Sequence, residues 1–311
     1  MQNRSSFRSA LPYFPSPLRQ ALLHIPEQEA SQIPEIRLRL CRPLRIVNQS
    51  TEYSLTASGS CTTDDTLGIT VTREWMDALY QNLCTHSHHA VQHMLKQGYV
   101  TTAGGNRAGI IGTAVVQGQA VETVRAISGI NLRIASERKG CAEKLLQHPL
   151  LRGINGGILI AGPPASGKTT VLRDIARILG NSAHVCMIDE RGELAAVQNG
   201  IPQFSVGSQT DVLDGYPKAE GISIAVRVMS PSVLICDEIG GSAETQAILM
   251  SVNTGVRLIA SAHAAGLRQI YQRPQIRMLI DAGVFDAAFL LGTGTQCGQI
   301  QAAERLQGGT R

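Results

Sequence analysis

The chain has 311 residues with 43% hydrophobic and 17% charged side chains, a length and composition that exclude a disordered chain and allow two folded domains. Its formal net charge of +4 comes without a dense run of lysine and arginine, so charge alone gives no reason to expect nucleic-acid binding. The seven cysteines are scattered and include no C-x-x-C pair, which argues against a disulfide framework or a cysteine zinc site and favours reduced thiols.

The N-terminal part of the chain predicts a small α+β domain. Residues 1–25 are predicted to be a flexible arm, because the first 20 are rich in Ser, Arg and Pro. In the domain of residues 26–148, apolar and charged side chains alternate along residues 36–40, as in a half-buried strand. Residues 73–97 have a helical pattern, and residues 98–119 predict two short strands joined by a Gly-Gly-Asn turn.

The C-terminal part, residues 149–311, has a different pattern. Apolar, strand-like runs begin at Ile158 and alternate with helical stretches. This alternation predicts a parallel sheet with crossover helices, and the boundary falls near residue 150, where Pro and Gly interrupt the chain. The predicted fold class is α/β: a parallel-sheet domain that follows a smaller α+β domain.

Residues 162–169, GPPASGKT, match the phosphate-loop motif G-x-x-x-x-G-K-[ST], with an apolar run before it and a helical pattern after it. In such a loop the glycines let backbone N–H groups turn inward, and the start of the helix adds a favourable potential for anions. We expect Lys168 to reach the β- and γ-phosphates and Thr169 to bind Mg²⁺. The predicted ATP contacts are Gly162, Pro163, Pro164, Ala165, Ser166, Gly167, Lys168, Thr169 and Thr170.

Polar residues follow two further strand-like runs, at positions where an α/β sheet presents ligands. They are Asp189, Glu190, Arg191 and Glu193 after the first run, and Ser261 and His263 at the end of the second. These side chains could contact the γ-phosphate or the attacking water. Either group could instead belong to an ordinary surface loop.

The run Val233–Cys236 ends in the adjacent acidic residues Asp237 and Glu238. We expect Asp237 to contribute to the magnesium shell and Glu238 to orient or deprotonate the attacking water. Two adjacent carboxylates at a strand end are typical of a working ATPase of the RecA/AAA+ type, whereas signalling GTPases position the water with a glutamine located elsewhere. The sequence therefore favours hydrolysis over mere nucleotide binding.

Several rarer stretches resemble, in order along the chain, the family of stage III sporulation protein AA, which is similar to the ATPases of type II and type IV secretion systems. The resemblance covers roughly residues 30 to 300, and the stretches that carry it most clearly are GPPASGKTTVLRDIAR, IDERGELA, DVLDGYPKAEGI and IASAHAAG. It implies a RecA-like ATPase domain and a Mg²⁺-dependent, hexameric enzyme. It also implies a location in the cytoplasm of the mother cell, with docking on integral membrane proteins of the channel to the forespore.

The resemblance also implies roles for particular residues. In the secretion ATPases, the acidic stretch after the phosphate loop and a histidine box both serve hydrolysis; here they correspond to Asp189, Glu190 and Glu193, with Asp189 near the metal, and to His263. The histidine box is reduced to SAHAAG. Cations that reach across a subunit interface are a further expectation. The candidates are Arg191, Lys218 and Arg227, with Arg37 and Arg39 as N-terminal alternatives that could equally be solvated.

His86, His88, His89 and His93 lie close together in the sequence, but only Cys84 accompanies them as a possible further ligand. Surface or packed histidines are therefore the default interpretation, and a metal site is the alternative.

The functional interpretation is an ATPase motor that energises assembly of, or transport through, the sporulation channel. No uninterrupted apolar stretch reaches the ~18 residues that span a bilayer, so we expect a soluble protein that meets the membrane through partners. One alternative is an ATPase stimulated by nucleic acid, against which stands the lack of an aromatic-rich basic platform. Another is a scaffold that nucleotide locks, in which Glu238 never serves turnover.

Overall fold

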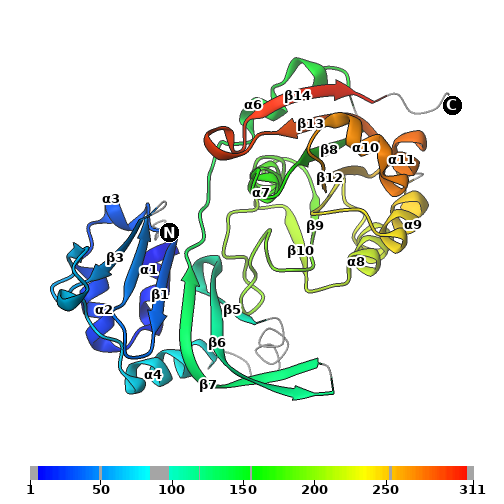
Figure 1. Ribbon diagram of the computed structural model, residues 1–311. Coiled ribbons are helices and arrows are strands. Elements are labelled where there is room, and N and C mark those ends of the chain that lie inside the picture. The colour runs from blue at the N-terminus through cyan, green and yellow to red at the C-terminus, as the bar shows by residue number, and fades with distance from the viewer. Residues whose placement is uncertain are drawn as a thin grey trace. The chain divides into compact units, whose positions relative to one another are not determined.

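The structure is a computed structural model that describes residues 6–48, 51–84, 98–118, 120–154, 156–251 and 254–306. The chain forms two compact units, Met1–Ser136 and Glu137–Arg311 (Figure 1). The predicted boundary after residue 148 is therefore too late. The reason is packing: Ala142 and Leu145 are buried in a core of the second unit, so the segment that contains them belongs to that unit.

The first unit is built on a seven-stranded antiparallel sheet with the order β4-β3-β2-β1-β7-β6-β5. Buried apolar and partly exposed charged side chains alternate along β1, as predicted: Ile36 and Leu38 are fully buried, while Arg37 and Arg39 point to the other face. The predicted turn between β5 and β6 is also present, with Gly104 and Gly105 in left-handed conformations. The strands are β1 Glu35–Arg39, β2 Arg45–Asn48, β3 Thr51–Leu55, β4 Cys61–Thr62, β5 Tyr99–Thr102, β6 Asn106–Gln117 and β7 Ala120–Arg133.

The predicted N-terminal arm is helical and packed from residue 6 onward. Its apolar residues Phe7, Leu11, Phe14, Leu18 and Leu22 are all almost fully buried in the core of the first unit. They recur at intervals of three and four residues, a helical period that the prolines and serines between them obscure. The helices and turns are α1 Ser6–Ala10, η1 Leu11–Tyr13, α2 Ser16–Leu23, α3 Glu27–Ala30, η2 Asp65–Leu67, α4 Arg73–Cys84 and η3 Ala103–Gly105.

The histidines at positions 86, 88, 89 and 93 lie outside the described residues. In the part of the chain that the structure does describe, no three His, Cys, Asp or Glu side chains are grouped as metal ligands. The same part contains no helix that combines the length and the apolar character needed to cross a bilayer.

The second unit has a seven-stranded sheet with the order β10-β9-β11-β12-β8-β13-β14. All neighbours run parallel except β14, which is antiparallel to β13. Every residue of β8, β9 and β11 is buried, as expected of strands covered on both faces. The strands are β8 Gly157–Gly162, β9 Val185–Asp189, β10 Thr210–Asp214, β11 Val233–Cys236, β12 Arg257–His263, β13 Phe285–Leu291 and β14 Ile300–Arg305.

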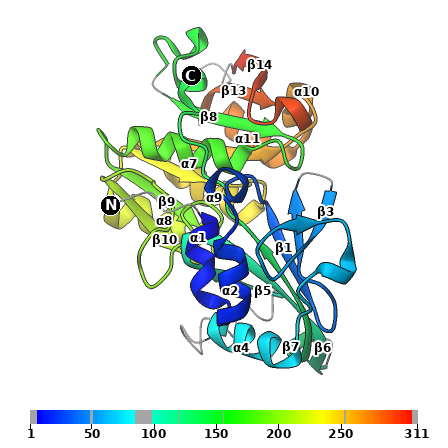
Figure 2. The same cartoon turned by 90° about the vertical axis from the view of Figure 1, so that its left-hand side faces the viewer.

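Two apolar cores lie on opposite faces of this sheet. Alternate residues of β8 face opposite ways: Ile158 and Ile160 join one core with α7, whereas Leu159 and Ala161 join the other. Helices α8, α9, α10 and α11 cover the second core (Figure 1), and Figure 2 shows the sheet from the side that α7 covers. The helices and turns are α6 Glu143–Leu146, η4 Pro149–Leu151, α7 Lys168–Leu179, α8 Lys218–Ile224, the π-helical turn η5 Ala225–Met229, α9 Ser242–Ser251, α10 Leu267–Gln272, α11 Pro274–Asp281 and η7 Gly294–Gln296.

Candidate functional site

The phosphate-loop motif connects the end of β8 to the start of α7. Ala165 and Gly167 both have left-handed backbone conformations, with φ of +59° and +86°. At Gly162 the missing side chain makes room for Ser166, whose Oγ would collide with a Cβ there. The loop is thus wound tightly ahead of the N-terminus of α7, where unpaired N–H groups favour an anion.

Lys168 lies inside this loop. It is only 6% exposed, and its Nζ donates hydrogen bonds of 2.9 Å to the carbonyls of Gly162 and Pro163. A third contact, of 3.4 Å, reaches Nδ1 of His263. Burial lowers the pKa of Lys168, although the charges of Asp237 and Glu238 oppose that effect. The ammonium group is therefore held by backbone oxygens at the place where the motif predicts a phosphate.

Thr169 and Asp237, predicted from distant motifs to share a metal, are in direct contact. Thr169 Oγ1 donates to Asp237 Oδ2 at 2.5 Å, and Asp237 Oδ1 accepts from the Ser261 hydroxyl and from the Glu238 N–H. These contacts arise because β11 and β12 are adjacent parallel strands and end at the same edge of the sheet. A hydroxyl and a carboxylate placed together are the hard oxygen ligands that Mg²⁺ prefers, so these residues fit the ion.

Glu238 is the centre of a chain of polar contacts. His263 Nε2 donates to one carboxylate oxygen at 2.7 Å, and Arg191 Nη1 donates to the other at 2.9 Å. Desolvation acts to raise the pKa of Glu238, but the hydrogen bond from His263 and the charges of His263, Arg191 and Lys168 outweigh it and lower the pKa. Glu238 also has a φ of +48°, a strained conformation for a residue other than glycine.

Lys218 contacts the backbone of Glu238 within the same chain. The side chain is 8% exposed, and its Nζ donates to the Glu238 carbonyl at 2.9 Å. Glu190 and Glu244 lie 3.6 and 3.5 Å from the same Nζ. Burial and three partners in its own chain account for the position of Lys218, so nothing in this geometry supports the expectation that it reaches across a subunit interface. Glu190 was expected at the site, but its pairing with Lys218 was not, and Glu244 was not anticipated at all.

The carboxylate of Asp189 is taken up by backbone donors. It is 2% exposed, and its carboxylate accepts hydrogen bonds of 2.8 to 3.3 Å from the N–H groups of four consecutive residues, 193–196. A carboxylate with that many backbone donors has no lone pairs directed at a metal, so the structure replaces its assignment as a metal ligand.

A cavity of about 390 Å³ lies above the phosphate loop. Its walls combine the loop and α7 start, residues 164–170, with Glu193, Glu238 and His263. Arg227, another predicted cation of this unit, is exposed in the π-helical turn and is not among the described residues that line this cavity. In the first unit, Arg37 pairs with Glu35 and Glu52, and Arg39 donates to the Leu38 carbonyl.

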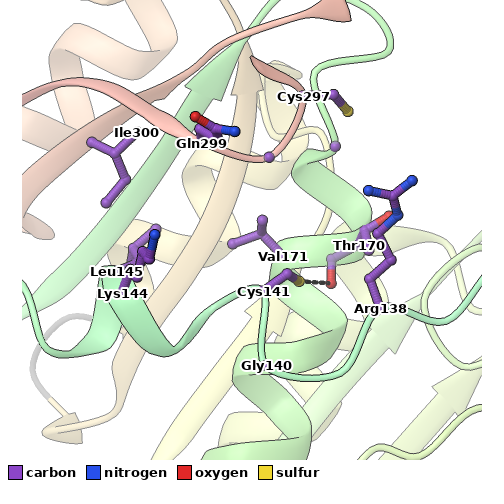
Figure 3. A pocket seen from close by; sticks show the side chains of 12 residues that line it. Arg138, Gly140, Cys141, Lys144, Leu145, Thr170, Val171, Cys297, Gln299 and Ile300 are labelled. Carbon is purple, nitrogen blue, oxygen red and sulfur yellow. Dashed lines mark hydrogen bonds between the residues drawn. The ribbon is translucent and has the colours of Figure 1, made fainter. Parts of the chain in front are cut away.

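A second cavity, of about 470 Å³, opens on the other side of Thr170 (Figure 3). Its walls come from three segments: residues 138–145 ahead of β8, residues 167–171, and residues 297–300 at the end of the β13–β14 connection and the start of β14. The last segment is attached to the phosphate loop, because Gly298 N donates to Ser166 O at 2.9 Å and Cys297 Sγ to Ala165 O at 3.3 Å. Neither flanking segment carries a known nucleotide-binding motif, so the sequence analysis did not assign them to the site.

The model of the family described as "Sporulation stage III, protein AA" matches residues 14–310. The chain belongs to this family. Stage III sporulation protein AA of Bacillus subtilis (strain 168) is 36% identical to it over 278 residues, which is 88% of this chain and 86% of that protein. The uncharacterized protein ycf45 of Cyanidium caldarium is 30% identical over 56% of this chain and 52% of its own length. The resemblance to the family seen in the sequence is thus confirmed.

Two solved structures show the fold of this member of the sporulation stage III, protein AA family. The Legionella pneumophila ATPase DotB has a TM-score of 0.54 at 16% identity, over 89% of this chain and 76% of DotB. The pilus retraction motor PilT with bound ADP has a TM-score of 0.54 at 15% identity, over 83% of this chain and 74% of PilT. The predicted class, a parallel-sheet P-loop ATPase domain after a smaller α+β domain, is therefore confirmed as a fold.

Proposed function

We propose that this chain hydrolyses ATP in a Mg²⁺-dependent reaction and that it works during endospore formation, as an oligomer and most simply as a hexamer. The observation that supports this best is one cavity above the phosphate loop that is bordered by Lys168, Glu238 and His263. Binding groups for phosphate and a carboxylate base thus face one space. A scaffold that only holds nucleotide would have no need for the base.

The phosphate loop binds the β- and γ-phosphates in this proposal. Backbone N–H groups of the loop and the N-terminus of α7 surround the anion, and Lys168 exchanges its two carbonyl partners for phosphate oxygens. Thr169 and Asp237 would hold Mg²⁺, which when bound neutralises charge on the phosphates. The nucleoside then lies in the 470 Å³ cavity, because the two cavities meet at Gly167 and Thr170.

Glu238 acts on the attacking water. Its lowered pKa keeps the carboxylate ionised at neutral pH, so that it can accept a hydrogen bond and then a proton from the water. His263 contacts both Glu238 and Lys168. When a phosphate binds Lys168 and breaks its contact with His263, the hydrogen bond from His263 to Glu238 is also affected. Turnover is thereby coupled to occupation of the phosphate loop.

The partners we propose are further copies of this chain and integral membrane proteins of the channel between mother cell and forespore, reached from the mother-cell cytoplasm. The 36% identity to a stage III sporulation protein supports this setting. Arg227 is the best placed cation for a neighbouring subunit, because it is exposed in a π-helical turn, a rare element that is frequent at functional sites. Nucleic acid is not part of the proposal.

The test is steady-state ATP hydrolysis together with the mass of the oligomer, for the natural chain and for Glu238→Gln, with and without Mg²⁺. We expect the natural chain to turn over and the variant to lose at least about a hundredfold in kcat while retaining ATP in a larger assembly. The matched control is Glu220→Gln, an exposed carboxylate on α8, which should leave turnover unchanged.

Two outcomes would count against the proposal. If the natural chain binds ATP but does not hydrolyse it, and Glu238→Gln behaves identically, the scaffold alternative takes its place. If single-stranded RNA or DNA stimulates hydrolysis with a steep dependence on salt, the chain is a nucleic-acid-dependent ATPase.

A further inference from the structure

A short segment of backbone, residues 193–196, lies between two buried charged side chains. On one side, Asp189 at the end of β9 accepts the N–H groups of all four residues. On the other side, Arg173 in α7 donates from Nη2 to the Glu193 carbonyl and from Nε to the Leu194 carbonyl, both at 2.7 Å. The N–H groups of this segment therefore point toward Asp189, and the carbonyl oxygens of Glu193 and Leu194 point toward Arg173.

Both charges are deeply buried, with Asp189 at 2% and Arg173 at 7% exposure. Removing a charge from water is costly unless it is well hydrogen-bonded, so these side chains are not incidental. Arg173 is fixed further by the ring of Phe204, whose centroid lies 3.6 Å from the guanidinium carbon. Burial lowers the pKa of Arg173 to about 10, which still leaves it charged at neutral pH.

The segment connects two parts of the proposed nucleotide site. Arg173 is one helical turn beyond Thr169, so it moves with the start of α7 and with the phosphate loop. Glu193, whose backbone is held on both sides, lines the cavity above that loop together with Glu238. Ala196 has a φ of +48°, a conformation that persists in a non-glycine residue only where the surroundings impose it.

We propose that Asp189 and Arg173 form a clamp that holds Glu193 at the phosphate cavity, where its carboxylate orients the attacking water. Asp189 and Arg173 are positioning residues in this proposal, because they act through Glu193 and do not touch ATP. The inference rests on the proposed ATPase activity. It gives Asp189 the role of holding the Glu193 backbone in place of metal binding. It gives Arg173 the same role, which no sequence motif indicates.

The experiment compares kcat, KM and thermal unfolding of the full chain for Glu193→Gln, Arg173→Lys and the double variant. Arg173→Lys retains the charge but lacks the planar fork that donates to two carbonyls. We expect each single variant to lower kcat by about tenfold or more, with KM changed by less than roughly threefold, because substrate contacts are untouched. Since both changes act through one carboxylate, the double variant should be no slower than Glu193→Gln.

One control variant and two further measurements keep the result unambiguous. Arg177→Lys alters the neighbouring arginine of the same helix, which pairs with Asp174 at 2.7 Å, and should leave kcat unchanged. Phe204→Leu removes the ring under Arg173 and retains the backbone N–H that donates to the Ala195 carbonyl at 3.3 Å; it should produce a milder loss of kcat, also if Arg173→Lys fails to fold. Backbone amides 193–196 should also exchange hydrogen faster in Asp189→Asn than in the natural chain, because each loses an anionic acceptor.

The clamp is overturned if Glu193→Gln turns over like the natural chain, if the two changes are fully additive, or if Arg173→Lys raises KM at unchanged kcat. Each of these results can occur while Glu238→Gln is inactive, so the clamp can fail and the proposed function stand. If the natural chain itself does not hydrolyse ATP, both fail together.

Discussion

Replacing Ser261 with alanine tests how the ends of β11 and β12 hold the acidic pair. Ser261 is fully buried; its hydroxyl donates to Asp237 and accepts the N–H of Glu238 at 3.0 Å. A hydrogen bond to a charged group contributes about 1.5–3 kcal/mol. The variant leaves no buried polar group without a hydrogen bond, however. The Glu238 N–H still donates to Asp237 Oδ1 at 2.9 Å, and Asp237 still accepts a hydrogen bond from Thr169. We therefore expect the free energy of unfolding to fall by about 2 kcal/mol.

The same change should slow hydrolysis. Glu238 is held at a φ of +48° by the two acceptors of its N–H, and such a conformation costs on the order of 1–3 kcal/mol when nothing imposes it. With one acceptor gone, the carboxylate samples other positions. We expect kcat to fall by about tenfold, which corresponds to roughly 1.4 kcal/mol in the activation barrier.

Urea unfolding and steady-state kinetics measure the two effects. The matched control is Ser223→Ala, where an exposed hydroxyl donates to the Ala219 carbonyl at 3.0 Å within α8. That variant should change the free energy of unfolding by less than about 0.5 kcal/mol and leave kcat unaltered. The reasoning is refuted if the two serine variants are equally stable, or if Ser261→Ala loses stability but retains full turnover.

Three more predictions follow from single contacts. Gly167→Ala should weaken ATP binding at least about tenfold in a titration with a fluorescent analogue. The reason is that φ of Gly167 is +86° and that an added Cβ would lie 3.2 Å from Cys297 Sγ and 3.3 Å from the Gly298 backbone. The control Gly266→Ala, where the glycine has open space around it, should bind ATP normally. His263→Ala should move the acidic limb of the pH–rate profile to higher pH, because it removes a partner that lowers the pKa of Glu238. If the acidic limb stays at the same pH, Glu238 is not the base. Desolvation and the nearby Asp189 charge raise the pKa of Asp214 from 3.8 to about 6, so between these pH values the folded state binds more protons than the unfolded state and its stability falls as the pH rises. Asp214→Asn should therefore be more stable than the natural chain at pH 7 but not at pH 4, by no more than ~1 kcal/mol because the side chain is exposed. Equal stability of the two chains at both pH values would contradict this.

Motifs with strict spacing were readable without a structure. The phosphate loop requires glycine at turning positions and Lys-Thr at the start of a helix, and Gly167 and Lys168 are found there. Asp237 and Glu238 follow an apolar run, so their place at a sheet edge followed from strand geometry. The N-terminal helices were missed although Phe7, Leu11 and Phe14 repeat at helical spacing, because the prolines between them suggested a loose arm.

The roles of charged side chains depended on tertiary structure. Asp189 and Arg191 are two positions apart in the sequence, yet Asp189 is buried and accepts four backbone N–H groups, whereas Arg191 is exposed and pairs with Glu238. Lys218, from a later stretch, is buried and donates to the Glu238 carbonyl. Local sequence does not determine these differences, because burial and partners come from strands and helices far away in the chain.

Local periodicity and residues a few positions apart were enough to identify the family, the two-domain α/β class and the place of the phosphate loop and acidic pair. That Asp189 and Arg173 bind one peptide segment, and that residues 138–145 and 297–300 enclose a cavity beside Thr170, could be seen only after the chain was folded. A charge or a cavity wall acquires its function from the groups packed around it, and the order of strands in the sheet brings those groups together.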